Sequence, residues 1–147
     1  MWHLKFKFNL NYNPSPKGRP RMTKTGHVFT PKKTADCESD LKVLLLEALN
    51  GQWPIIGPVR IVMTMLLPRP KNHYGTGKNK SVLKDKSPTL HFKRPDLDNL
   101  EKLFFDAANE LLYQDDAQIC SKEVEKVYAT PPDTNVGYDT EVFEWRQ

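Results

Sequence analysis

The hydrophobic residues of this chain recur with two spacings, that of strands and that of helices. Alternation over residues 2–10 places five apolar side chains on one face of a strand: Trp2, Leu4, Phe6, Phe8 and Leu10. Residues 59–67 are apolar at nearly every position, which is typical of a strand buried on both faces. Further strands are expected at residues 28–30, from Asp115 to about Tyr128, and at 138–145.

Two segments have the spacing of amphipathic helices. The first is expected to be capped by Thr34 and to end at Gly51 and Pro54, with an apolar stripe of Leu41, Leu44, Leu45, Ala48 and Leu49. The clearest helix is expected from Asp98 to Leu112, and its apolar positions follow the i, i+3, i+4, i+7 rule. Its opposite stripe is polar and holds Asp98, Lys102, Asp106 and Asn109.

The remaining segments read as connections. Residues 13–21 hold three prolines and a glycine, which resist regular structure, and residues 69–94 form a long basic loop. The order of elements predicts an α/β (α+β) fold: a single small domain, residues 1–147, with a mixed sheet packed against two main helices.

Length and composition exclude several classes of protein. A chain of 147 residues suits one domain and needs no disulfides to fold. Its two cysteines, Cys37 and Cys120, form no C-x-x-C pair, which disfavours a zinc ribbon. No apolar run approaches the length of a membrane span, and residues 1–7 lack the apolar core of a signal peptide. We therefore expect a reduced, soluble, cytoplasmic protein with no membrane partner.

Charge is distributed unevenly along the chain. Residues 1–95 hold 18 Lys and Arg against 5 Asp and Glu, a formal charge of +13, whereas residues 96–147 hold 4 against 13, or −9, so that the total is +4. A basic half suits a polyanion and an acidic half can hold a cation. The densest basic run, expected to contact DNA phosphates unless it is simply a solvated loop, is Lys17, Arg19, Arg21, Lys24, Lys32 and Lys33.

The chemically suggestive stretch is acidic and surrounds the start of the second helix. Pro95 favours an extended lead-in that contains Asp96, and Asp98 is expected at the helix N-cap. Residues i and i+2 of an extended segment point to the same side, so the two carboxylates can converge on one cation. Three carboxylates would suit Mg²⁺ or Mn²⁺, and Lys102, on the same stripe, could contact a phosphate.

A second acidic pair, Asp115 and Asp116, follows the helix. Because a helix rises about 1.5 Å per residue, its far end lies roughly 20 Å from its start, and the helix alone cannot unite the two pairs. A returning strand or another subunit would have to do so. The residues alone also permit a plainer interpretation, in which Asp98 and Glu101 form a capping box and Asp115-Asp116 is a turn. The EF-hand, P-loop and dinucleotide-binding motifs are absent.

The acidic stretch carries a family resemblance. The run Arg94-Pro95-Asp96-Leu97-Asp98-Asn99-Leu100-x-Lys102, followed by Asp106-Ala107 and by Asp115-Asp116-Ala117-Gln118-Ile119, resembles the signature of RusA-type Holliday-junction resolvases. The segments 17–21 and 29–34 resemble the N-terminal pattern of that family. The chain departs from it at Ala108-Asn109-Glu110, where relatives more usually have Leu-x-Gly.

The resemblance implies a homodimeric, Mg²⁺-dependent endodeoxyribonuclease that nicks four-way DNA junctions in recombination and repair, from a bacterium or prophage. By motif position, the implied metal ligands are Asp96, Asp98 and Asp116, with Asp115 as the alternative third acid, and Lys102 is the implied functional lysine. Expected DNA contacts outside the basic run are Lys71, Lys93 and Arg94. The rival hypotheses are a non-catalytic junction-binding protein of the same fold and a phosphohydrolase acting on small molecules.

Overall fold

The structure is a computed structural model that describes residues 1–147. Its largest element is a four-stranded mixed sheet in the order β1-β6-β4-β5, formed by β1 (Trp2–Leu10), β4 (Val59–Leu67), β5 (Ile119–Tyr128) and β6 (Gly137–Trp145). β4 runs parallel to β5, and β6 is antiparallel to both β1 and β4. The predicted mixed sheet is confirmed, and β4 has the predicted bounds.

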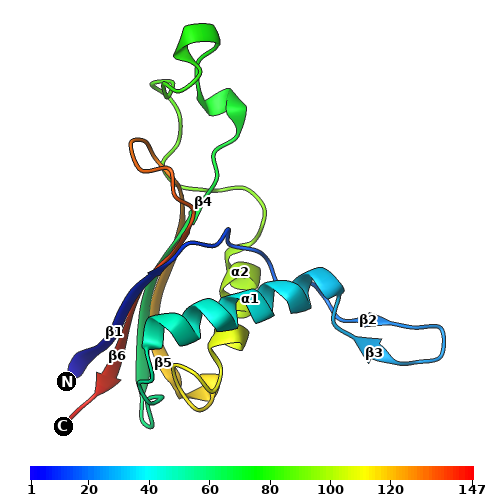
Figure 1. Ribbon diagram of the computed structural model, residues 1–147, viewed down its shortest axis with the longest axis vertical. Helices are drawn as coiled ribbons and strands as arrows, with labels where there is room; N and C mark the ends of the chain where they lie inside the picture. The colour runs from blue at the N-terminus through cyan, green and yellow to red at the C-terminus, as the bar shows by residue number, and fades with distance from the viewer.

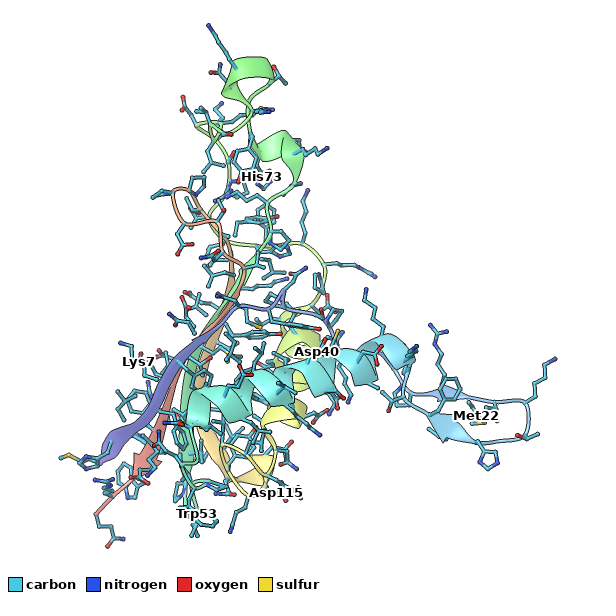
Figure 2. The ribbon with its side chains drawn as sticks, in the orientation of Figure 1. Lys7, Met22, Asp40, Trp53, His73 and Asp115 are labelled. Carbon is cyan, nitrogen blue, oxygen red and sulfur yellow. The ribbon has the colours of Figure 1, made fainter.

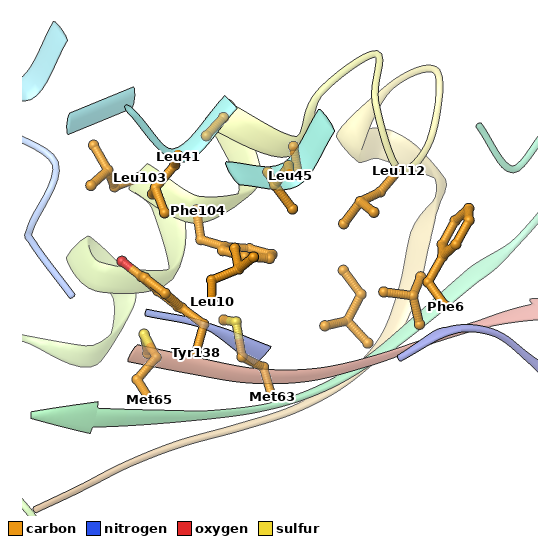
Figure 3. Close-up of a cluster of buried hydrophobic side chains, with 14 of the residues drawn as sticks. Phe6, Leu10, Leu41, Leu45, Met63, Met65, Leu103, Phe104, Leu112 and Tyr138 are labelled. Carbon is orange, nitrogen blue, oxygen red and sulfur yellow. The ribbon is translucent and has the colours of Figure 1, made fainter. Parts of the chain in front are cut away.

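Two helices, α1 (Lys32–Leu49) and α2 (Leu97–Ala108), pack together on one face of this sheet (Figure 1). The core lies between the two layers, where the Phe104 ring of α2 lies 5.2 Å from the Tyr138 ring of β6 (Figure 3). The α+β class with two main helices is therefore confirmed. β4 is buried only at alternate positions, because no helix covers the second face of the sheet.

The helix boundaries differ from those predicted. α1 begins at Lys32 with Pro31 as its N-cap, because the Thr34 hydroxyl accepts a hydrogen bond from the Gly18 amide (2.9 Å) instead of capping the helix. α2 has Asp96, not Asp98, at its N-cap. It ends at Ala108 because the following backbone turns away, with Glu110 at a φ of 68°. Ala48, expected on the apolar stripe of α1, is exposed.

Two strand predictions also need correction. Asp115 and Asp116 do not belong to β5; they form a turn with η3 (Asp116–Gln118), and the strand begins at Ile119. In β1 the register shifts between Leu4 and Phe6, which leaves Leu4 half-exposed rather than on the buried face.

Two segments project from the body (Figure 1). One is a hairpin of β2 (Arg21–Met22) and β3 (Val28–Phe29), here called the arm (residues 20–30), so that regular structure resumes at Arg21. The other is the basic loop, residues 69–94, with η1 (Lys71–His73) and η2 (Gly77–Asn79). Arg69 fixes the root of this loop by donating to the carbonyls of Ala129 (2.9 Å) and Pro88 (2.7 Å). None of the helices combines the length and the hydropathy that a bilayer crossing requires.

Candidate functional site

Asp96 and Asp98 lie at the start of α2 with their side chains exposed. Asp96 is the N-cap by position, yet its carboxylate accepts no hydrogen bond from the helix amides. Neither aspartate takes part in an ion pair, and Glu101, the other member of the expected capping box, pairs with Lys122 instead. The capping interpretation is therefore wrong for this helix, and both carboxylates are available to a ligand.

The backbone that carries these two acids is held from two sides. Lys126 of β5 donates to the carbonyls of Lys93 (2.5 Å) and Pro95 (2.6 Å) just before α2. The Lys17 amide donates to the Asn99 carbonyl (2.9 Å) in the first turn of the helix. The side chains are thus free while their backbone is fixed, an arrangement suited to a preformed binding site.

The second acidic pair lies in a turn made by its own hydrogen bonds. The Asp115 carboxylate accepts from the Ala117 amide (3.0 Å), and the Gln118 side chain accepts from the Asp115 amide (2.8 Å), which together form a capping box. Gln118 also donates to the carbonyls of Ile55 (2.8 Å) and Gly57 (2.9 Å), which ties the turn to the segment before β4. The amide of Asp116 donates to the Asn109 side chain (3.1 Å).

The two carboxyls of this turn have pKa values shifted in opposite directions. The pKa of Asp116 is raised above its ordinary value, first by a hydrogen bond shared with the Asp115 carboxyl and then by desolvation. The pKa of Asp115 is lowered, first by the hydrogen bond from the Ala117 amide. Asp115 is therefore stabilised as an anion inside the turn, whereas the charge of Asp116 is opposed by its neighbours and would be favoured by a cation.

The polar side of α2 between the two pairs carries Lys102 and Asp106. Lys102 is exposed, and its positive charge acts on Asp116 to lower the pKa of that carboxyl. Asp106 does not pair with Lys102, four residues earlier on the helix, but with Lys17 (3.1 Å), which also pairs with Glu38. Beside Asp116 opens a groove of about 310 Å³, lined also by Phe105, Ile119, Cys120, Ser121 and Lys122.

The structure does not gather the two acidic pairs within one chain. No three His, Cys, Asp or Glu side chains lie close enough together to hold a metal ion. α2 separates the pairs and, with 12 residues, is about 18 Å long. The returning strand β5 starts only after the Asp115-Asp116 turn, so it does not bring that turn back to Asp98. The Asp96–Asp98 pair offers two free carboxylates to a ligand, and in the second pair the carboxylate of Asp116 is the one without a capping hydrogen bond.

Comparison with known proteins places this chain among DNA-cleaving enzymes. The family model described as endodeoxyribonuclease RusA matches residues 11–137. This chain belongs to the RusA endodeoxyribonuclease family. It is also 30% identical over 133 residues to "Uncharacterized protein YqaN" of Bacillus subtilis (strain 168), an alignment that covers 88% of this chain and 92% of that protein. The resemblance carried by the acidic motif is confirmed, and so is nuclease activity in its general sense.

In this RusA-family chain, the residues expected to contact DNA fall into two groups. Lys17 is turned inward: its side chain is 19% exposed and its ammonium is engaged by Glu38 and Asp106, so a DNA contact would require that it leave them. The other eight are exposed and take part in no ion pair: Arg19, Arg21, Lys24, Lys32, Lys33, Lys71, Lys93 and Arg94. They lie on the arm or directly before it, at the start of α1 and along the basic loop.

Proposed function

We propose that this protein is a Mg²⁺-dependent endonuclease that resolves four-way DNA junctions by paired symmetric nicks in recombination and repair. The observation that carries the proposal is the Asp96–Asp98 pair, whose carboxylates are exposed and unpartnered on a fixed helix N-terminus. Carboxylates without a structural task, in a chain of an endodeoxyribonuclease family, fit a divalent-cation site.

The proposed ligands are Asp96, Asp98 and Asp116, with Mn²⁺ as an alternative to Mg²⁺. Asp116 is preferred to Asp115 as the third acid because the oxygen of Asp115 already accepts the Ala117 amide. When bound, the metal would polarise the phosphodiester and stabilise negative charge on the leaving oxygen. The proposed task of Lys102, exposed between the two acidic pairs, is to contact the phosphate in the transition state.

We further propose that the site is completed across a homodimer. The acids of one chain lie at opposite ends of α2, so a two-fold axis that sets the Asp115-Asp116 turn of one subunit beside the Asp96-Asp98 turn of the other would form two identical sites. Two sites related by symmetry suit a four-way junction, which must be nicked on two symmetry-related strands.

The deciding experiment is cleavage of a fixed four-way junction labelled on each strand in turn. With Mg²⁺ we expect paired nicks at symmetric positions on two opposing strands, and no nicks in EDTA. Nicks of equal frequency in linear duplex would contradict the assignment to junctions. Binding to the junction with no cleavage in any divalent ion would favour the rival, a junction-binding protein without activity.

A further inference from the structure

A second feature of the surface lies where the arm joins α1. There a cavity of about 320 Å³ opens between residues 15–21 and the first turn of the helix. Three of its lining residues, Arg19, Arg21 and Lys33, are cationic, and none is acidic. A concave site with this charge favours an anion.

The three cationic side chains of the cavity, Arg19, Arg21 and Lys33, have no ion-pair partner in the chain. Lys17, two residues before Arg19, shows the contrast, since it is paired with both Glu38 and Asp106. Glu38 and Asp106 are therefore engaged by a lysine that does not line the cavity.

The backbone adds donors and shape to the same place. α1 has no side-chain cap at Pro31, and its first intrahelical bond runs from the Ala35 amide to the Pro31 carbonyl, so the amides of the first turn are left for another acceptor. Gly18 packs so closely on Thr34 that a Cβ atom there would lie 2.6 Å from the Thr34 hydroxyl oxygen. The wall of the cavity thus requires glycine.

The cavity is connected to the acidic pair by one hydrogen bond. The Lys17 amide donates to the carbonyl of Asn99 (2.9 Å), the residue after Asp98, and Gly18 and Arg19 follow directly. An anion in the cavity would therefore lie beside the start of α2. The cationic surface continues outward along the arm, where Arg21 is paired across the hairpin with the exposed Phe29 and Lys24 is also exposed. A chain of phosphates suits this surface better than one isolated anion.

We propose that the cavity lined by Arg19, Arg21 and Lys33 binds one backbone phosphate of the DNA, and so positions the strand relative to Asp96 and Asp98. The inference rests on the proposed function for its substrate, but it concerns binding and not the chemical step. It predicts that junction binding depends on the negative charge of one particular phosphate, which this cavity holds.

The test compares the double variant Arg19→Gln/Arg21→Gln with a control of equal charge loss, Lys5→Gln/Lys7→Gln. The control residues lie on β1, outside the cavity, and Lys7 is exposed (Figure 2). Junction binding is measured in EDTA over a series of salt concentrations. Loss of the contact to this one phosphate should reduce the slope of log K against log salt by about 1. Equal slopes and affinities for the two double variants would overturn the proposal.

A second arm of the experiment locates the phosphate. Junctions with a neutral methylphosphonate at one position at a time should show one position where the wild-type protein loses affinity and the double variant loses none. A flat scan, with inorganic phosphate shifting the Gly18 amide resonance, would mean that the cavity takes free phosphate and would overturn the DNA assignment. Lys33→Gln, which lies outside the hairpin strands, repeats the measurement should the double variant disturb the arm.

Because binding is measured without metal, the proposed nuclease function and the proposed phosphate site can be refuted independently. Wild-type protein that never cleaves junctions would contradict the proposed function and leave the cavity result standing. Normal cleavage with a double variant that binds like its control would contradict only the cavity.

Discussion

The two ends of α2 carry two pairs of aspartates that the structure treats differently. At the N-terminal end Asp96 and Asp98 make no side-chain hydrogen bond or ion pair, and only their backbone is held. At the other end Asp115 serves as a cap acceptor and Gln118 closes the turn with four hydrogen bonds. The carboxylate of Asp115 therefore has a hydrogen-bonding task within the fold. Those of Asp96 and Asp98 have none, and no bond within the chain accounts for the charge of Asp116. The comparison therefore separates carboxylates that build the fold from those left for a ligand.

The largest effect on cleavage is expected from substitution at the N-terminal end of α2. Asp98→Asn should reduce junction cleavage by about 10³-fold or more, since several kcal/mol of transition-state stabilisation depend on the metal. Because Asp98 has no partner within the chain, unfolding should change by no more than about 0.5 kcal/mol. Nicking rates and denaturant unfolding measure the two quantities. Asp85→Asn, on the basic loop, is the charge-matched control, and normal cleavage by Asp98→Asn would refute the site.

Mixing two inactive variants tests whether the ends of α2 meet across subunits. If they do, a heterodimer of Asp98→Asn with Asp116→Asn has one site with both substitutions and one site with none. After denaturation and refolding of an equal mixture, half of the dimers are mixed, and nicking should recover to about a quarter of the wild-type level. If instead both acids of a site came from one chain, every site would carry a substitution and the mixture would stay inactive.

Substitutions in the Asp115-Asp116 turn are expected to change the stability of the protein. Gln118→Ala removes the side chain that bonds the carbonyls of Ile55 and Gly57 and the amide of Asp115, and should lower the free energy of unfolding by about 2 kcal/mol. Gln114→Ala lies in the same turn, is exposed and makes no side-chain hydrogen bond, so it is the matched control. Equal urea midpoints for the two variants would show that the turn does not depend on Gln118.

Much of this fold follows from short-range patterns in the sequence. The apolar periodicity of α2 and the apolar run of β4 identified both elements, because a buried stripe constrains every third or fourth residue and a strand every second. The turn at Asp115-Asp116, which the plainer interpretation predicted, is confirmed, and the capping-box spacing from Asp115 to Gln118 was a further signal for it.

The errors arose where a side chain bonds a distant segment. Thr34 has the residue type of a cap but bonds Gly18, 16 residues away. Residue spacing likewise did not indicate that Lys17 pairs with Glu38, 21 residues away, although the DNA contact expected of Lys17 stays a prediction. The same holds for the acids, since no local pattern tells a capping aspartate from a free one. Such partners depend on tertiary packing, which residue spacing does not encode.

The smallest expected effect is that of the Asp116 charge on thermal stability, measured on the protein without metal. A carboxyl whose pKa is raised by folding makes the folded state less stable above that pKa, and the loss is relieved as pH falls through it. Asp116→Asn removes this unfavourable charge. In EDTA at pH 7 the melting temperature of the variant should therefore lie slightly above that of the wild type. The difference should shrink as the pH is lowered through the raised pKa. Thermal unfolding over a pH series measures it, again with Asp85→Asn for the loss of one negative charge. Lower melting at neutral pH would mean that Asp116 stabilises the turn. A variant that melts higher yet no longer cleaves would mean that the chain keeps this carboxylate for its ligand and not for its fold.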